Sequence, residues 1–239
     1  MPADRETRII VLHLTKYGDR SLVVQALDRE RGRTGFFLGG AGKGRGGQGL
    51  FHSLGVLDIV STSRKGNLEY IREAERTFSQ DSLRTDPYKS AIALFISELL
   101  YRGVQEGAMD SDLFDFLTEQ IMALETATGS IANFHLKFLV DFCGAMGFRP
   151  KDNYSPSTPL FQPFSAEFTS PGSLAETFSQ EESQLLHDLL NTDLQQALAI
   201  PLSRDRRGAF AQKMADFLAY HLSLNLNIRS LKVLHDLFS

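Results

Sequence analysis

The chain has 239 residues, of which 42% are hydrophobic, and a formal net charge of −4, so it is long enough for two domains and apolar enough to bury a core. It has no apolar run of about 18 residues, no apolar stretch of the kind found in a signal peptide, and Cys143 as its only cysteine. We therefore expect no membrane-spanning helix, no leader and no internal disulfide, and a cytoplasmic location.

The first 80 residues predict short strands separated by turns. Strand-forming residues alternate with turns rich in glycine and charge, and the predicted strands cover residues 8–14, 21–28, 34–38, 56–63 and 68–75. About five short strands with no helix between them predict a small closed barrel. The OB-fold is the common solution at this size, and an SH3-like barrel has a similar number of strands.

From residue 86 onward the apolar residues recur with the period of a helix. Asp86 and Pro87 are typical of an N-cap and a first helical position. Further helices are predicted around residues 113–124, 134–146, 181–190, 194–199, 206–224 and 230–238. Residues 147–180, rich in Pro, Ser and Thr, predict a long loop.

The predicted fold class is therefore α+β, with two domains. A five-stranded OB-fold β-barrel in residues 1–80 is expected to bind nucleic acid. An all-α C-terminal domain follows in residues 81–239 and contains the loop 147–180.

Charge is distributed unevenly between these two parts. Residues 1–80 hold 13 Lys and Arg against 9 Asp and Glu, a net charge of +4, whereas the remainder holds 12 against 20, a net charge of −8. Such asymmetry predicts that the first part faces an anionic partner. The candidate phosphate contacts lie on two turns and one loop, opposed between residues 31 and 65 only by Asp58: Arg31, Arg33, Lys43, Arg45, Arg64 and Lys65.

The loop in this set, residues 39–49, has seven glycines in eleven residues. Such a backbone bends closely around a polyanion, although a plain hairpin tip has the same composition. It is not a P-loop, because Gly44 and not Ser or Thr follows Lys43. Phe36, Phe37 and Phe51 bracket the loop. Core burial is favoured for each, and an exposed one would offer a base a stacking surface.

Catalytic and metal-binding patterns are missing from the sequence. The six histidines do not pair at metal-ligand spacing, and one cysteine does not build a zinc site. We expect no catalytic residues, no metal, no cofactor and no enzymatic activity. Two alternatives stay open: a protein-interaction module that never touches DNA, and a metal-dependent nuclease, which would need clustered carboxylates or histidines.

Four segments give the chain a family resemblance. They are residues 16–21 after the first strand, 83–86 at the junction, and 217–222 and 228–234 near the end. Their pattern and order resemble the RecO family of bacterial recombination mediators. The resemblance implies an OB-fold and a helical domain that bind single- and double-stranded DNA. It also implies annealing of strands coated by the single-stranded-DNA-binding protein SSB, and help in loading RecA together with RecR, in association with the nucleoid.

The chain departs from the family pattern in two places. Many relatives carry a four-cysteine zinc module where residues 147–168 have no cysteine, and their loop after the third strand is denser in Lys and Arg. The resemblance also implies that the helical domain receives the acidic C-terminal tail of SSB. Such a tail needs an apolar pocket rimmed by cations, for which the candidates are Arg229, Lys232 and Lys213. Ordinary surface cations at a helix are the alternative.

Overall fold

The computed structural model describes residues 4–18, 21–39, 47–63, 69–107, 109–172 and 177–238. These fall into two compact units, Met1–Thr126 and Ala127–Ser239. The domain boundary predicted at residue 80 marks the change from strands to helices, and the first compact unit continues past it to include three helices.

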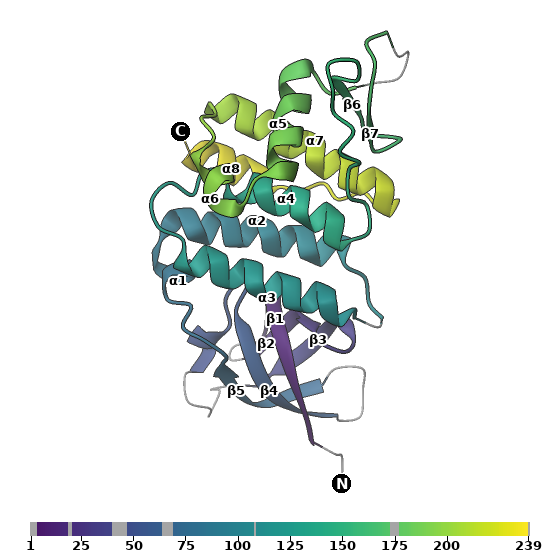
Figure 1. Cartoon of the computed structure of the whole chain (residues 1–239). Coiled ribbons are helices and arrows are strands. Elements are labelled where there is room, and N and C mark those ends of the chain that lie inside the picture. The colour runs from purple at the N-terminus through teal and green to yellow at the C-terminus, as the bar shows by residue number, and fades with distance from the viewer. Residues whose placement is uncertain are drawn as a thin grey trace. The chain divides into compact units, whose positions relative to one another are not determined.

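A barrel forms the start of the first unit, drawn in purple to blue in Figure 1. Its strands are β1 (Asp4–Tyr17), β2 (Ser21–Asp28), β3 (Gly32–Leu38), β4 (Val56–Ser63) and β5 (Glu69–Arg76). They close in the order β1-β2-β3-β5-β4, with β1 antiparallel to β4 and β3 parallel to β5. This is the Greek-key order of the OB-fold, so the predicted barrel is confirmed.

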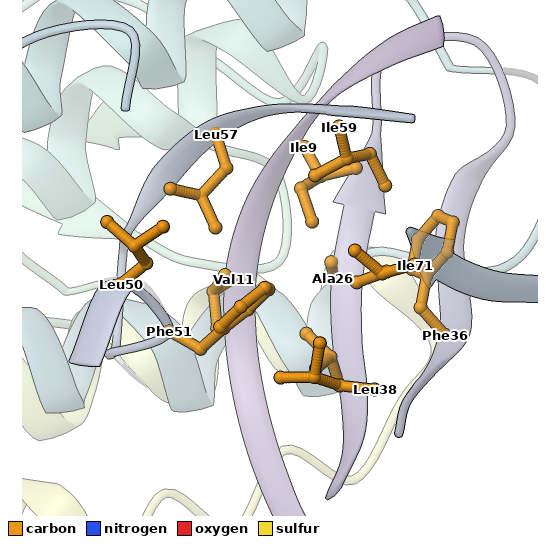
Figure 2. Close-up of a cluster of buried hydrophobic side chains, with 11 residues drawn as sticks. Ile9, Val11, Ala26, Phe36, Leu38, Leu50, Phe51, Leu57, Ile59 and Ile71 are labelled. Atoms are coloured by element: carbon orange, nitrogen blue, oxygen red, sulfur yellow. The ribbon is translucent and has the colours of Figure 1, made fainter. Parts of the chain in front are cut away.

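Side chains that point inward from every strand fill the barrel, as Figure 2 shows. Ile9 and Val11 are two residues apart on β1 and both have no exposed surface, as the period of a strand requires. The 3-10 helix η1 (Gly47–Leu50) brings Leu50 and the following Phe51 into the same core. Burial of each large apolar side chain stabilises the barrel by roughly 1.5–3 kcal/mol.

The helices of the first unit are α1 (Ser82–Thr85), α2 (Pro87–Gly103) and α3 (Ser111–Thr126). The predicted start of α2 is confirmed, because the Asp86 carboxylate accepts hydrogen bonds from the N–H groups of Tyr88 and Lys89 at 2.8 and 3.2 Å. At the end of α3, the Glu125 carboxylate accepts from the N–H groups of Ser82 and Leu83, both at 2.9 Å. The free N–H groups of α1 are thereby satisfied from α3.

The second unit contains α4 (Phe134–Ala145), α5 (Gln180–Asn191), α6 (Leu194–Ala199), α7 (Arg204–Leu222) and α8 (Ser230–Leu237), in teal to yellow in Figure 1. Its helices lie where the sequence predicts them. A capping box starts α5, since Ser179 and Glu182 each accept a backbone N–H of the other. Among the described residues, no helix combines the length and the apolar character that crossing a bilayer requires.

The segment predicted as a long loop contains a small hairpin, β6 (Leu160–Gln162) and β7 (Glu167–Thr169). The Asn153 side chain exchanges two hydrogen bonds with the backbone of Phe168, at 2.8 and 2.9 Å. The Phe161 ring, fully buried, packs against Phe168 and Phe178 at centroid distances of 5.3 and 5.2 Å, and against Phe217 at 5.7 Å. Aromatic packing thus anchors the hairpin.

Candidate nucleic-acid interface

The six candidate phosphate contacts fall into two groups. Lys43, Arg45, Arg64 and Lys65 lie outside the described residues. Arg31 and Arg33 lie on either side of Gly32, where β3 begins.

Arg31 is held by a carboxylate of the barrel. Its guanidinium forms an ion pair with Glu69, which also accepts a hydrogen bond from the Ser61 hydroxyl at 2.8 Å and lies 3.7 Å from Arg5. The hydrogen bond to Glu69 raises the pKa of Arg31. Burial acts to raise the pKa of Glu69, but the hydrogen bonds from Ser61 and Arg31 outweigh it and lower that pKa. Arg31 therefore keeps its charge, and half of its side chain stays exposed.

Arg33 is fixed against α2. It donates a hydrogen bond to the Tyr101 carbonyl at 2.8 Å, and its guanidinium carbon lies 5.0 Å from the centre of the Tyr101 ring. Beside it, Gly32 has a φ of 66°, and a Cβ there would lie 2.7 Å from the carbonyl oxygen of Gly107. Only a glycine lets the start of β3 come this close to the chain that follows α2. Arg33, the next residue, lies within reach of the Tyr101 carbonyl as a result.

Three aromatic side chains meet on the outer face of the barrel. Tyr17 ends β1, Phe37 lies near the end of β3, and Tyr70 lies near the start of β5. The Phe37 ring lies 5.7 Å from the Tyr17 ring and 4.8 Å from the Tyr70 ring. We call these residues the aromatic trio.

The pairing of the strands explains this meeting. Phe37 lies opposite Tyr70 in the parallel pair of β3 and β5, and opposite Val23 on β2. Phe36 points into the core and is fully buried, and Phe51 is buried too, as expected. Phe37 is half-buried and points the other way. Of the three phenylalanines that bracket the glycine loop, Phe37 is therefore the one that keeps some exposed surface.

The aromatic trio marks where three connections start or end. Residues 18–20 follow Tyr17, residues 39–55 follow the end of β3, and residues 64–68 precede β5. In sequence, these connections carry Arg20, Lys43, Arg45, Arg64 and Lys65. Sequence analysis missed Tyr17 and Tyr70 as site residues. Their position at strand ends beside charged turns is a signal, but only the closure of the barrel shows that they meet.

An open groove of about 1060 Å³ lies on another part of the barrel, over β1, β4 and β5. Its arginines are already neutralised. Arg8 binds Asp58 at 2.8 and 3.1 Å, and Arg72 binds Asp4 at 3.1 Å. With Glu6, Glu73 and Glu75 also in its wall, the groove does not favour a polyanion.

In the second unit, the three candidates for the SSB tail differ in their surroundings. Lys213 binds Glu182 at 2.6 Å and lies 5.3 Å from the centre of the Phe178 ring. Arg229 and Lys232 are exposed at the start of α8, and neither has an ion pair within the part of the chain that the structure describes. A hollow of about 10 Å³ beside α8 is lined by Arg204, Arg207 and other residues, and by none of the three candidates.

The described residues contain no group of three or more His, Cys, Asp or Glu side chains placed to hold a metal ion. Cys143 is buried, and burial raises the pKa of its thiol, so the unreactive protonated form is favoured.

Comparison with known proteins gives matches along nearly the whole chain. Residues 1–79 match the family model described as Recombination protein O N terminal, and residues 84–230 match Recombination protein O C terminal. Similar proteins named DNA repair protein RecO occur in Christiangramia forsetii, 30% identical over 97% of this chain and 98% of the relative, and in Phocaeicola vulgatus, 32% identical over 96% and 97%. A relative of the same name in Bacteroides fragilis is 32% identical over 96% and 97%.

Proposed function

Since the chain belongs to the RecO family of DNA repair proteins, we propose that it is a recombination mediator whose barrel binds single- and double-stranded DNA, chiefly by charge. With its partners it anneals SSB-coated strands and, together with RecR, helps to load RecA. It works at the nucleoid and makes or breaks no bond. The proposed phosphate contacts are Arg31, Arg33, Lys43, Arg45, Arg64 and Lys65.

The observation that carries this proposal is the meeting of strand ends at the aromatic trio. Because the Phe37 ring contacts those of Tyr17 and Tyr70, the connections that carry Lys43, Arg45, Arg64 and Lys65 in their sequences leave the barrel from neighbouring points. A connection of five residues, such as 64–68, spans at most roughly 3.3–3.6 Å per residue. We propose that the cations of these connections act together on one stretch of DNA backbone.

The six cations do not contribute equally in this proposal. The Arg31 guanidinium is shared with Glu69, and the Arg33 guanidinium with the Tyr101 carbonyl and ring. A phosphate would have to compete with those partners. Lys43, Arg45, Arg64 and Lys65 therefore carry most of the affinity, and Arg31 and Arg33 add to it at the edge.

Reversal of the loop charges tests the DNA-binding part. A handful of phosphate contacts predicts a slope of roughly −3 to −5 for log affinity against log salt concentration. We expect a Lys43→Glu, Arg45→Glu variant of the full chain to bind both single strand and duplex more weakly, with a slope flatter by about 2. Fluorescence anisotropy with labelled oligonucleotides at several salt concentrations measures both quantities.

An Arg229→Glu, Lys232→Glu variant is the matched control, because it changes the net charge equally but lies in the second unit. Equal binding and equal slopes for wild type and the loop variant would contradict the proposal. A wild type that binds no DNA would favour the alternative of a protein-interaction module. Cleavage of the labelled DNA in the presence of Mg²⁺ or Mn²⁺ would favour the nuclease.

For the second unit we propose that Arg229 and Lys232, with Lys213, receive the acidic tail of SSB. Support comes from the exposure of Arg229 and Lys232 beside the half-buried Leu231 on α8. Lys213 is expected to contribute less, because Glu182 already neutralises it. Titration of a labelled tail peptide compares wild type with the Arg229→Glu, Lys232→Glu variant, and the loop variant now serves as the charge-matched control. Equal affinity in all three proteins would contradict this site.

A further inference from the structure

We propose that the aromatic trio is a stacking platform for unpaired bases, so that the barrel holds single-stranded DNA by its bases as well as by its phosphates. The inference rests on the proposed function and deepens it. It names single-stranded DNA with exposed base faces as the preferred ligand, and it separates the binding of a single strand from the binding of a duplex.

The trio does not belong to the core of the barrel. The core is filled from inside by Phe36, Phe51 and the aliphatic residues around them. Tyr17 is 64% exposed, and its ring stands edge-on to Phe37, with an interplanar angle of 81°. A large aromatic ring left this exposed contributes little to folding. Its exposed surface is available to a base, and every base has a face that stacks.

A glycine lies beside the trio on the outer face of β3. Along β3 the residues on the outer face are Arg33, Gly35 and Phe37, because Phe36 and Leu38 point into the core. Gly35, between the arginine and the phenylalanine, has no side chain and is half-buried. A glycine inside a strand is typical of a place where a ligand approaches the backbone closely.

Charge complementarity identifies the occupant. Lys16, next to Tyr17, is exposed, and two of the three connections at the trio carry four of the six cations of the proposed phosphate site in their sequences. One exposed ring and two half-buried rings beside cations suit a strand whose phosphates are neutralised while its bases stack on the rings. In a duplex the base faces are already covered by neighbouring bases, so a duplex gains only the charge part of this site.

A paired measurement with the full chain tests the inference. Probes are an oligothymidine carrying one 2-aminopurine, a duplex of the same length, and an oligonucleotide of the same length in which abasic sites replace the bases. We expect wild type to quench the 2-aminopurine and to bind the abasic strand more weakly than the normal one. Tyr17→Ala and Phe37→Leu should each weaken single-strand binding by about 5- to 100-fold, leave duplex binding unchanged, and keep the salt slope, because rings release no counterions.

Two further variants serve as controls. Tyr17→Phe retains the ring and should bind as wild type does. Tyr220→Ala removes another exposed tyrosine, in the second unit, and should have no effect. Circular dichroism on each variant separates lost stacking from lost folding.

The outcomes distinguish this inference from the proposed function. If wild type binds with a clear salt dependence but the trio variants bind single strands as well as wild type does, the platform is wrong and charge-based binding stands. Equal affinity for abasic and normal strands would overturn the platform in the same way. If wild type binds neither strand form, the proposed function and the inference both fail.

Discussion

In the first compact unit charged and polar side chains help to join the helices to the barrel, whereas packed phenylalanine rings surround the hairpin of the second. In the first, Arg29 binds Asp115 at 2.6 and 2.9 Å, and Arg33 donates to the Tyr101 carbonyl. In the second, Phe161 contacts three other rings. The salt bridges and hydrogen bonds that stabilise the first unit also neutralise part of its surface charge.

Because of these pairs, the barrel attracts DNA less strongly than its number of basic residues suggests. The 13 Lys and Arg of residues 1–80 include six arginines that the structure pairs with carboxylates: Arg5, Arg8, Arg29, Arg31, Arg72 and Arg76. The exposed pairs among these contribute little to stability, but all of the pairs neutralise charge. A count of basic residues therefore overstates the attraction for DNA, and the position of a cation on a connection is the better guide.

The largest effect is expected in the aromatic core of the second unit. Phe161→Ala should lower the free energy of unfolding by about 3–5 kcal/mol, because it empties a fully buried site that three rings surround. Urea denaturation of the full chain measures this loss. Phe164→Ala is the matched control, since its ring is 49% exposed and should cost about 1 kcal/mol or less. Equal losses would mean that the ring cluster does not hold the unit together.

Next comes the buried carboxylate of the first unit. Asp28 has no exposed surface, accepts from the N–H groups of Glu30 and Arg31 at 2.9 and 3.2 Å, and pairs with Arg5. Asp28→Asn keeps an acceptor for the turn but removes the charge that faces Arg5. We expect a loss of about 2–3 kcal/mol in urea denaturation. Asp58→Asn, at an exposed pair with Arg8, should lose under about 1 kcal/mol, and the reverse order would contradict the comparison.

Acid should weaken the second unit through His135. Burial, and to a smaller extent the charge of Arg207, lowers the pKa of His135 from 6.5 to about 3. The unfolded chain takes up a proton below about pH 6.5 while the folded chain does not, so stability falls as the pH drops. The slope approaches about 1.4 kcal/mol per pH unit, or about 2 kcal/mol between pH 6.5 and 5.

Urea denaturation at several pH values, for wild type and a His135→Gln variant, checks this dependence. The difference in stability between the two proteins should shrink steadily as the pH falls from 6.5 to 5. A difference that is the same at every pH in this window would show that His135 does not carry the effect.

The smallest effect is expected at Arg33. Arg33→Lys keeps the charge but loses the planar group that lies over Tyr101 and donates to its carbonyl. We expect a loss of about 1 kcal/mol in stability and a change in DNA affinity smaller than that caused by Lys43→Glu. A large loss of affinity with unchanged stability would instead make Arg33 a main DNA contact, and its role in joining the barrel to α2 would be minor.

Much of the fold follows from local patterns in the sequence. The bounds of β2 and β4 match the prediction because turn-forming residues lie at both ends, and Asp86 with Pro87 starts α2 as expected. By contrast, β1 begins at Asp4 and not at residue 8. Its first residues are polar and mixed in character, and their pairing with β4, such as Asp4 with Thr62, supplies the order. Such pairing between distant segments leaves no local pattern.

The hairpin β6–β7 and the aromatic trio were missed for related reasons. Strands of three residues are too short to show alternation, and Asn153 fixes the hairpin through its side chain. The trio joins residues 17, 37 and 70 only because the barrel closes. The sequence also gives no sign that Arg33 donates a hydrogen bond to the carbonyl of Tyr101, which lies 68 residues further along the chain.

The closure of the barrel also sets an order of events during synthesis. Pairs such as Arg8 with Asp58 join residues 50 positions apart, and β5, which completes the ring of strands, ends only at Arg76. Until the ribosome has released β4, the edge of β1 that will pair with it stays without its partner. Distant pairings of this kind form slowly, and an unpaired edge can add a strand from another chain. The nascent protein is therefore most exposed to misassembly after β1–β3 have emerged and before β4 and β5 follow.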